Sequence, residues 1–374
     1  MDKQASKTLL VIGNGFDLHL KAKTKYDHFF DSSFFKKRKE ACFDWIRACK
    51  KDLDGHKALA SFNMLNAPAN CWDLFFCLMS PQYSEKQNTR WCDIETEIYN
   101  SLQLASSSFF SWERVQNLIV FPNSSFDNDS LRKHDTDERI MALYLEAKGW
   151  GPSHIGDSSF YDKLLNELEC FEKLFGEYIS NEVNTDTYIC EARSLVDVLC
   201  DVSQGRIMID SFNYSDFSDL EYPIRHINGD CANPIFGVDL KKNGSHTVDQ
   251  AFPFSKTYRR LKQDAAGLRF HQTDDKTEIS RAVVFGHSLN PMDYDYFHYL
   301  FTLLGFNSLD LKKMGHIEFV FNVYDQDQKF EIIKGKIDSI YALLNQYEDT
   351  ISESKSRVLI NLLRFSGKMT IREI

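Results

Sequence analysis

Short apolar runs that end in polar or turn-forming residues recur along the chain. Five of them lie at residues 9–12, 206–212, 224–227, 282–285 and 317–323. Continuous apolar runs of this length, without alternation, are typical of strands in a parallel sheet covered on both faces. The pattern therefore predicts five buried parallel strands.

Helical periodicity fills the intervals between these runs. Residues 161–179 have apolar side chains at helical spacing, and residues 26–50 are also expected to be helical. A second apolar stripe follows the last predicted strand: Phe330, Ile333, Ile337, Ile340, Tyr341 and Leu344. The Ser- and Asn-rich stretch at 106–129 is expected to be a mobile loop. Strands that alternate with helices indicate the α/β class.

The strands are unevenly spaced, because a long segment separates the first from the second. No internal repeat and no Pro-rich or Gly-rich linker marks a domain boundary. We therefore expect one α/β domain over residues 1–374, with a doubly wound, mainly parallel, Rossmann-like sheet. Its sheet core is expected at 1–30 and 200–330, a large helical insertion at 31–199, and a C-terminal helical segment at 331–374.

Composition narrows the class of protein. The formal net charge of −10 disfavours sequence-independent binding to nucleic acid. No segment approaches the roughly 18 uncharged apolar residues of a membrane helix, and the N-terminus shows no export signal. Nine cysteines are scattered without a C-x-x-C pair, which favours reduced core thiols over a disulfide framework or, more remotely, zinc. The expectation is a cytoplasmic protein with no membrane contact.

Polar residues follow each predicted strand at its C-terminal end. In chain order they are Gly13-Asn14-Gly15-Phe16-Asp17, Asn213-Tyr214-Ser215, Asn228-Gly229-Asp230, Gly286-His287-Ser288 and Tyr324-Asp325. Ligands of an open parallel sheet bind beyond the carboxyl ends of its strands. The five motifs together predict a ligand pocket at one edge of the sheet, and we expect Asn213 to serve the ligand more than the core.

The glycine turn at Gly13 to Gly15 is suited to a phosphate, because glycine lets the backbone approach closely and a helix N-terminus offers free amides. A plain structural turn is the alternative. The dinucleotide fingerprint G-x-G-x-x-G is incomplete, since Leu18 replaces its third glycine. Asp17 could cap backbone amides or hold a ribose hydroxyl.

Two histidines are candidates for the same edge. His226 shares a strand face with Asn228, but a strand histidine is more often a packed core residue. His287 directly follows Gly286 at a strand end, which favours exposure to the pocket. In the insertion, Trp91 and Glu95 stand at the head of a predicted helix, and we expect both to face the pocket if the insertion covers it. No zinc-protease spacing, G-x-S-x-G elbow or P-loop is present.

The whole string of motifs resembles the AbiH abortive-infection family of bacteria, from the N-terminus to about residue 300. Order and spacing are both preserved. The motifs that carry the resemblance are Gly13-Asn14-Gly15-Phe16-Asp17 with Thr24, Tyr26 and Phe29, Trp91 with Glu95, Phe212-Asn213-Tyr214-Ser215, His226-Ile227-Asn228-Gly229, Phe254-Ser255-Lys256, and Gly286-His287-Ser288-Leu289 with Asp293 and Tyr296.

The order of these signals is also similar to the sirtuin-like domains of bacterial antiphage NAD hydrolases. That resemblance implies a Rossmann-like sheet that holds NAD, with Asn213 positioning the water or ribose and a histidine acting on the ribose hydroxyl. This sequence departs at the expected histidine, where Asn228 stands, and His226 is the nearest histidine. Asparagine cannot be a general base at neutral pH.

The first hypothesis is an antiphage effector that binds and hydrolyses NAD or a related nucleotide, without a metal. Asn213 and His226 are its catalytic candidates. The cofactor-binding candidates are Gly13, Asn14, Gly15, Asp17, Tyr214, Asn228, Gly286, His287, Ser288 and Asp293. Expected partners are the nucleotide, a phage-derived trigger or partner defence protein, and a second copy of the chain, with nucleic acid disfavoured.

Two alternatives belong to other classes. One is a nucleotide sensor or partner-binding module that makes no product, which the replacement by Asn228 favours. The other is a metal-dependent nuclease that uses Asp17, Glu95 and His287 and reaches nucleic acid through the basic run at residues 256–262.

Overall fold

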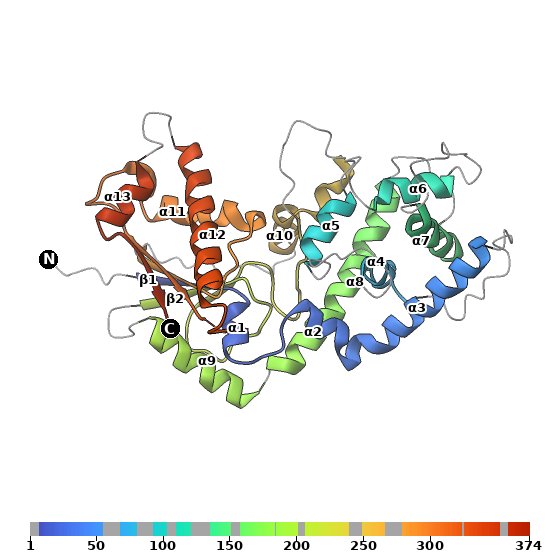
Figure 1. Cartoon of the computed structure of the whole chain (residues 1–374), viewed down its shortest axis with the longest axis horizontal. Coiled ribbons are helices and arrows are strands. Elements are labelled where there is room, and N and C mark those ends of the chain that lie inside the picture. Colours follow the sequence, from blue (N-terminus) through green and yellow to red (C-terminus); the bar gives the residue numbers. More distant parts are fainter. Residues whose placement is uncertain are drawn as a thin grey trace. The chain divides into compact units, whose positions relative to one another are not determined.

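The computed structural model describes residues 7–54, 68–80, 93–102, 110–120, 135–150, 158–183, 185–200, 206–238, 249–265, 279–323, 325–351 and 358–374. The chain divides into two compact units (Figure 1). Unit 1 comprises residues 1–24, 179–232 and 266–374, and unit 2 comprises residues 25–178 and 233–265. The expectation that the whole chain is one domain stays a prediction.

Unit 1 is built on a six-stranded parallel sheet in the order β3-β2-β1-β4-β5-β6. The strands are β1 (Lys7–Ile12), β2 (Arg206–Ser211), β3 (Ile224–His226), β4 (Ile279–Phe285), β5 (His316–Phe321) and β6 (Met369–Glu373). All five predicted strands are confirmed. The order is that of a doubly wound nucleotide-binding sheet, so the α/β, Rossmann-like class is confirmed as well.

The sixth strand, β6, lies in the C-terminal segment that was expected to be helical, so that expectation is wrong for Met369–Glu373. The strand is short, and three of its residues, Thr370, Ile371 and Glu373, are exposed. It forms the sheet edge beside β5, where only one side needs a partner. An edge strand of this kind needs no apolar run, and the sequence therefore lacks the signal that identified the buried strands.

Helices cover both faces of this sheet. The helices α11 (Tyr294–Leu303), α12 (Lys329–Thr350) and α13 (Leu359–Phe365) pack on one face in a single apolar cluster with the strands. Figure 1 shows α9 (Asp186–Leu199) on the opposite side of the sheet. Unit 1 also contains α1 (Gly15–His19) and two short 3₁₀ segments, Pro291–Asp293 and Phe306–Ser308.

The predicted apolar stripe of α12 is only partly its buried face. Ile340 and Leu344 are buried, together with Leu343 and Tyr347, which the stripe did not include. Phe330, Ile337 and Tyr341 are instead exposed, Phe330 to 76%. The helix therefore contacts the core through its second half, and its first half presents apolar side chains outward.

Unit 2 is helical in its described parts, as expected for an insertion. Its helices are α2 (Tyr26–Asp31), α3 (Ser33–Asp54), α4 (Cys71–Met79), α5 (Ile94–Leu102), α6 (Trp112–Val120), α7 (Asp135–Ala147), α10 (Lys256–Ala265) and most of α8 (Ser158–Val183), with a 3₁₀ segment at Asp249–Phe254. The predicted helices at 26–50 and 161–179 are confirmed.

The loop expected at 106–129 is wrong for Trp112–Val120, which forms α6. Trp112, Val115 and Ile119 are buried at spacings of three and four residues, a helical stripe that the flanking Ser and Asn residues obscured. Within the described residues no helix is long and apolar enough to cross a membrane.

The eight described cysteines are all free. Five are buried, as expected for core thiols, but Cys170 on α8 and Cys190 on α9 are exposed. These two positions depart from the expectation because they lie on the outward faces of their helices.

Candidate functional site at the carboxyl edge of the sheet

The predicted motifs share one edge of the sheet. Because all strands are parallel, the residues after β1, β2, β3, β4 and β5 all lie at the carboxyl edge. Asp325 belongs to this set, whereas Tyr324 lies outside the described residues. The expectation that the glycine turn, Asn213, Asn228, Gly286 and Asp325 lie at the same edge is confirmed.

The glycine turn packs backbone against backbone on the loop after β4. A Cβ atom on Gly15 would lie 2.6 Å from the Cα of Gly286, and one on Gly13 would lie 2.6 Å from the Cα of His287. Gly286 itself has a φ of +70°, which favours glycine. The three glycines are therefore required by the contact between two strand-end loops.

The expected free amides of this turn are not available at three positions. The amides of Gly13 and Gly15 donate to the carbonyls of Phe285 and Gly286, and that of Phe16 donates to Gly13. The expectation is wrong there because these amides already donate to carbonyl oxygens of β4, of the residue after it and of the turn itself. The Asn14 side chain is exposed, and its Oδ1 accepts from the Thr24 hydroxyl.

Asp17 is the centre of a buried cluster of neutral donors. Its Oδ1 accepts from the Tyr188 hydroxyl at 2.6 Å and from Asn213 Nδ2 at 2.9 Å, and its Oδ2 accepts from the Ser215 hydroxyl. Burial raises the pKa of Asp17 to about 6, although these hydrogen bonds act in the opposite direction. The carboxylate thus links the β1 turn to the end of β2 and to α9.

Asn213 is more of a core residue than expected. It is buried, and its Nδ2 is held by Asp17, so the prediction that the side chain serves mainly a ligand is wrong. Its Oδ1 is buried without a hydrogen-bond partner among the described residues. A buried acceptor of this kind is costly unless a donor reaches it, which makes Oδ1 the atom of this cluster most suited to a ligand hydroxyl or a water.

His226 lies next to this cluster. His226 of β3 pairs with Ser211 of β2 in the sheet, and its Nδ1 lies 3.5 Å from the Asn213 carbonyl oxygen. The ring stacks on Phe217 with an interplanar angle of 9°. Burial lowers the pKa of His226, although Asp230 acts in the opposite direction, so the imidazole is neutral near pH 7.

The remaining residues of the β2 and β3 ends differ in burial. Asn228 is buried, whereas Tyr214 is half-buried. Gly229, which follows Asn228, has a φ of +80° and makes the turn after β3. Asn228 therefore occupies a buried turn position.

His287 is buried between two aromatic rings instead of being exposed, so the expected exposure is wrong. Its ring centroid lies 4.4 Å from Phe212 and 5.0 Å from Phe297. Its Nδ1 accepts from the Leu289 amide at 2.8 Å, and its Nε2 lies 3.6 Å from Asp293 Oδ2. The next residue, Ser288, is exposed and is the part of this loop open to a ligand.

A partly buried triad lies on the other face of β2, and Tyr296 is the one of its three residues that the sequence motifs included. Arg225 on β3 donates through Nε to Asp210 Oδ1 at 2.9 Å, and the Tyr296 hydroxyl donates to Asp210 Oδ2 at 2.5 Å. Desolvation and the Asp210 charge raise the pKa of Tyr296, which keeps the phenol protonated. The sequence signal that could have indicated this triad was the charged residue Asp210 inside an otherwise apolar strand.

Glu95 and the basic run at residues 256–262, the described candidates from the alternative hypotheses in unit 2, form ion pairs there. Glu95 forms an ion pair with Lys256 at 2.9 Å, and Arg259 forms one with the buried Glu172. Lys262 pairs with Glu169 at 2.9 Å. The basic run at 256–262 is thus largely committed to carboxylates of its own unit. Trp91 lies outside the described residues, and the expectation that it faces the site stays a prediction.

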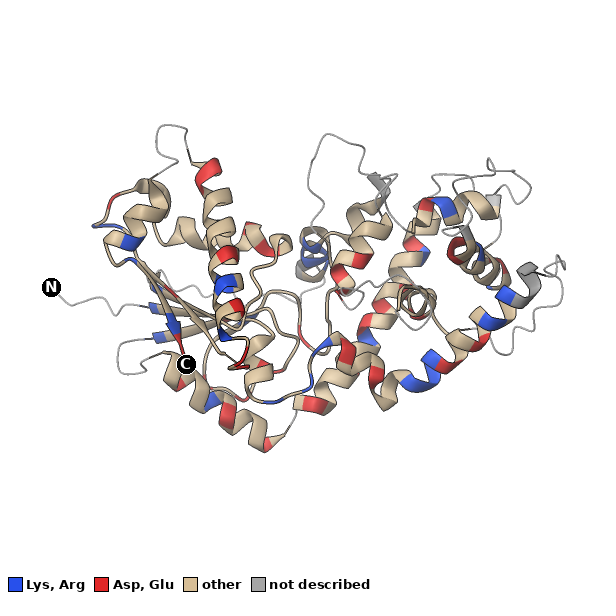
Figure 2. Cartoon of the chain, viewed as in Figure 1, with Lys and Arg blue, Asp and Glu red and all other residues tan. Residues whose placement is uncertain are grey.

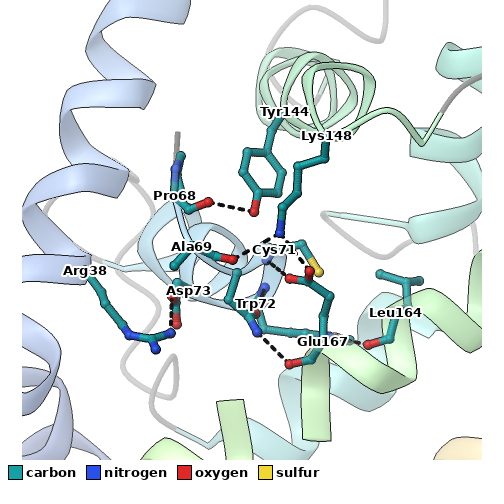
Figure 3. Close-up of polar contacts among 11 residues, drawn as sticks. Arg38, Pro68, Ala69, Cys71, Trp72, Asp73, Tyr144, Lys148, Leu164 and Glu167 are labelled. Atoms are coloured by element: carbon teal, nitrogen blue, oxygen red, sulfur yellow. Dashed lines mark hydrogen bonds and ion pairs between the residues drawn. The ribbon is translucent and has the colours of Figure 1, made fainter. Parts of the chain in front are cut away.

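Unit 2 has its own buried polar cluster, shown in Figure 3. Lys148 and the Cys71 amide donate to the two carboxylate oxygens of Glu167 at 2.7 and 2.8 Å, which ties α4 to α7 and α8. Arg38 on α3 pairs with the buried Asp73 of α4 at 3.0 Å. These contacts join helices, and they leave Asp73 Oδ1 buried without a hydrogen-bond partner among the described residues. Figure 2 shows basic and acidic residues interspersed along α3.

Within its own unit, each nuclease candidate contacts protein side chains. Within the described residues, no group of three His, Cys, Asp or Glu side chains could hold a metal ion. Asp17 and His287 face the partners given above, and Glu95 faces Lys256.

A family model described as bacteriophage abortive infection AbiH matches residues 9–312. No curated protein and no solved structure matches the chain.

Proposed function

The chain belongs to the AbiH family of bacteriophage abortive infection, and on that premise we propose that it acts by binding and hydrolysing NAD or a related nucleotide. The proposed site is the carboxyl edge of the sheet around Gly13, Asn213 and His226. The sirtuin-like order of the motifs in the sequence supports NAD as the nucleotide.

One observation carries the proposal. Asn213 Oδ1 is a buried acceptor without a partner among the described residues. Asn213 lies two residues after the end of β2, beside the glycine turn after β1. A ribose hydroxyl or a bound water would supply the missing donor. Doubly wound sheets bind dinucleotides at this edge.

The reaction requires little from the protein beyond positioning and one base. Water attacks C1′ of the nicotinamide ribose, the N-glycosidic bond breaks, and neutral nicotinamide leaves with the bonding electron pair. The proton of the water passes to a base, and ADP-ribose is the second product. The neutral imidazole of His226 can accept that proton, while the Asn213 carboxamide orients the water or the ribose.

A second candidate is a nucleotide sensor without turnover. Asn228, at the position where the sirtuin-like order has histidine, cannot accept a proton, and Asn213 is already tied to Asp17. Binding without cleavage would follow if His226 were only a packed residue against Phe217.

The test is to incubate the pure protein with NAD, with ATP and with single-stranded nucleic acid, and to identify the products by mass. We expect nicotinamide and ADP-ribose from NAD. His226→Ala should lower turnover by about a hundredfold, the size of a general-base contribution, with little change in affinity. His316→Ala is the matched control, since His316 begins β5 at the opposite edge and its pKa is also lowered by burial.

Each outcome decides between the candidates. Bound but uncleaved NAD supports the sensor. Normal turnover by His226→Ala would show that His226 is a packed core residue and that another group is the base. Intact, unbound NAD beside shortened nucleic acid overturns the proposal.

A further inference from the structure

Lys336 is a half-buried cation at the same edge of the sheet. It comes from the second turn of α12, and its ammonium donates to the carbonyl oxygen of His287 at 3.4 Å. This long contact is the one hydrogen bond that the Lys336 ammonium makes to the described residues. None of the described carboxylates forms an ion pair with it. Burial lowers the pKa of Lys336.

The ammonium lies beside the contact between the β1 and β4 loops. His287, whose carbonyl it meets, is also the residue whose Cα would touch a Cβ on Gly13. β1 and β4 are neighbours in the sheet, and the chain proceeds from them in opposite directions, to β2 and to β5. This is the topological switch point, where doubly wound sheets bind the phosphates of a nucleotide.

Helix geometry explains how the side chain reaches this point. Side chains of an α-helix tilt toward its N-terminus, and α12 begins after the carboxyl end of β5. A long lysine stem in the second turn therefore extends toward the carboxyl edge.

The glycine turn offers a phosphate fewer donors than expected. The amides of Gly13, Gly15 and Phe16 are already bonded to carbonyls. A phosphate oxygen would give the Lys336 ammonium a charge-assisted hydrogen bond in place of a weak one to a carbonyl.

We propose that Lys336 is the phosphate contact of the site at the carboxyl edge, and that its ligand is a nucleotide with a phosphate or pyrophosphate group, not a nucleoside. This inference rests on the proposed nucleotide binding and adds a residue to it. Lys336 lies beyond residues 9–312, so the contact comes from a part of the chain that the family model does not include.

The test compares Lys336→Met with Lys334→Met, which removes an exposed charge from the same helix. Calorimetry measures the binding of NAD, inorganic pyrophosphate and adenosine to the full chain. Lys336→Met should weaken NAD and pyrophosphate at least about tenfold, as expected for the loss of a charge-assisted hydrogen bond, and leave adenosine unchanged. Lys334→Met should change none of the three.

Lys336→Arg keeps the positive charge and should retain most of the affinity for NAD and pyrophosphate. This variant replaces the methionine variant in the test if Lys336→Met does not fold. Equal NAD affinity of wild type and Lys336→Met, or an equal loss for NAD and adenosine, overturns the role of Lys336 and leaves nucleotide binding intact. If wild type binds neither NAD nor adenosine, the proposed function fails. In that case the binding of pyrophosphate tests Lys336 alone. If wild type binds pyrophosphate and Lys336→Met does not, the anion site is supported. If wild type does not bind pyrophosphate, or if both proteins bind it equally, the role of Lys336 is overturned.

Discussion

Two carboxylates, Asp17 in unit 1 and Asp73 in unit 2, are both buried, but different groups stabilise their charge. Burial raises the pKa of each to about 6. Asp73 is compensated by the Arg38 guanidinium at 3.0 Å. Asp17 has neutral donors among the described residues, from Tyr188, Asn213, Ser215 and Thr24.

Each cluster leaves one buried oxygen without a partner among the described residues, Asp73 Oδ1 in unit 2 and Asn213 Oδ1 in unit 1. The Asp17 cluster is the one at the carboxyl edge of the sheet, where ligands bind. A cation fixes a buried carboxylate through charge, and in unit 2 this pair serves the packing of α3 on α4 (Figure 3). Hydroxyl and carboxamide donors have further hydrogen-bonding capacity. The Asp17 cluster thus holds Asn213 by one atom and leaves its Oδ1 for a ligand.

The largest effect is expected from removing the cation in unit 2. Arg38→Met leaves Asp73 buried without its charge partner and should lower the free energy of unfolding by about 3 kcal/mol. Chemical denaturation measures it. Arg47→Met is the control, because Arg47 forms an exposed pair with Asp44 and should cost less than about 1 kcal/mol. Equal losses would remove the distinction between the two kinds of carboxylate.

The pH dependence of stability tests Asp17 directly. Its folded pKa of about 6 exceeds the unfolded value of 3.8, so the folded state holds the proton more tightly. The stability from this proton is fully present below about pH 3.8 and is lost as the pH rises through about 6. Relative to Asp17→Asn, wild type should therefore lose on the order of 2 kcal/mol between pH 4 and pH 7.

Asp216→Asn is the control for this titration, since Asp216 is exposed in the same strand-end loop. It should leave the pH dependence of unfolding as in wild type. A difference between wild type and Asp17→Asn that stays constant over the whole pH range would contradict the raised pKa.

Asn213→Ala should be destabilising as well as inactivating. The variant removes the Nδ2 donor to Asp17 and leaves a small void, which should cost about 1–2 kcal/mol. Thermal unfolding at pH 7 measures this cost, and it should shrink at pH 4, where Asp17 is protonated. A variant as stable as wild type at both values would mean that the Asp17 contact contributes nothing.

The smallest effect is expected for Tyr188→Phe. The ring keeps its contact with Phe217, and Asp17 Oδ1 still accepts from Asn213. Loss of one hydroxyl donor should cost about 1 kcal/mol and raise the pKa of Asp17 further, which shifts the pH transition of stability upward. A downward shift would show that the hydroxyl does not favour the ionised carboxylate.

The sheet was largely predictable, because β1, β2, β4 and β5 are apolar runs and the motifs after them mark their carboxyl ends. β6 was not, since its exposed residues carry no such run. The Asp17 cluster was beyond local signals: its donors Tyr188 and Asn213 lie 171 and 196 residues away in the chain. The same holds for the burial of His287, which Phe212 and Phe297 produce from two other elements.

The most direct measurement is the site of photo-crosslinking by an azido-adenine analogue of NAD, with the labelled peptides identified by mass spectrometry and excess NAD as competitor. The account predicts competed labels at the carboxyl edge of the sheet, within residues 13–19, 213–230 or 286–293. Competed labels confined to α3, α4 or α10 would contradict it.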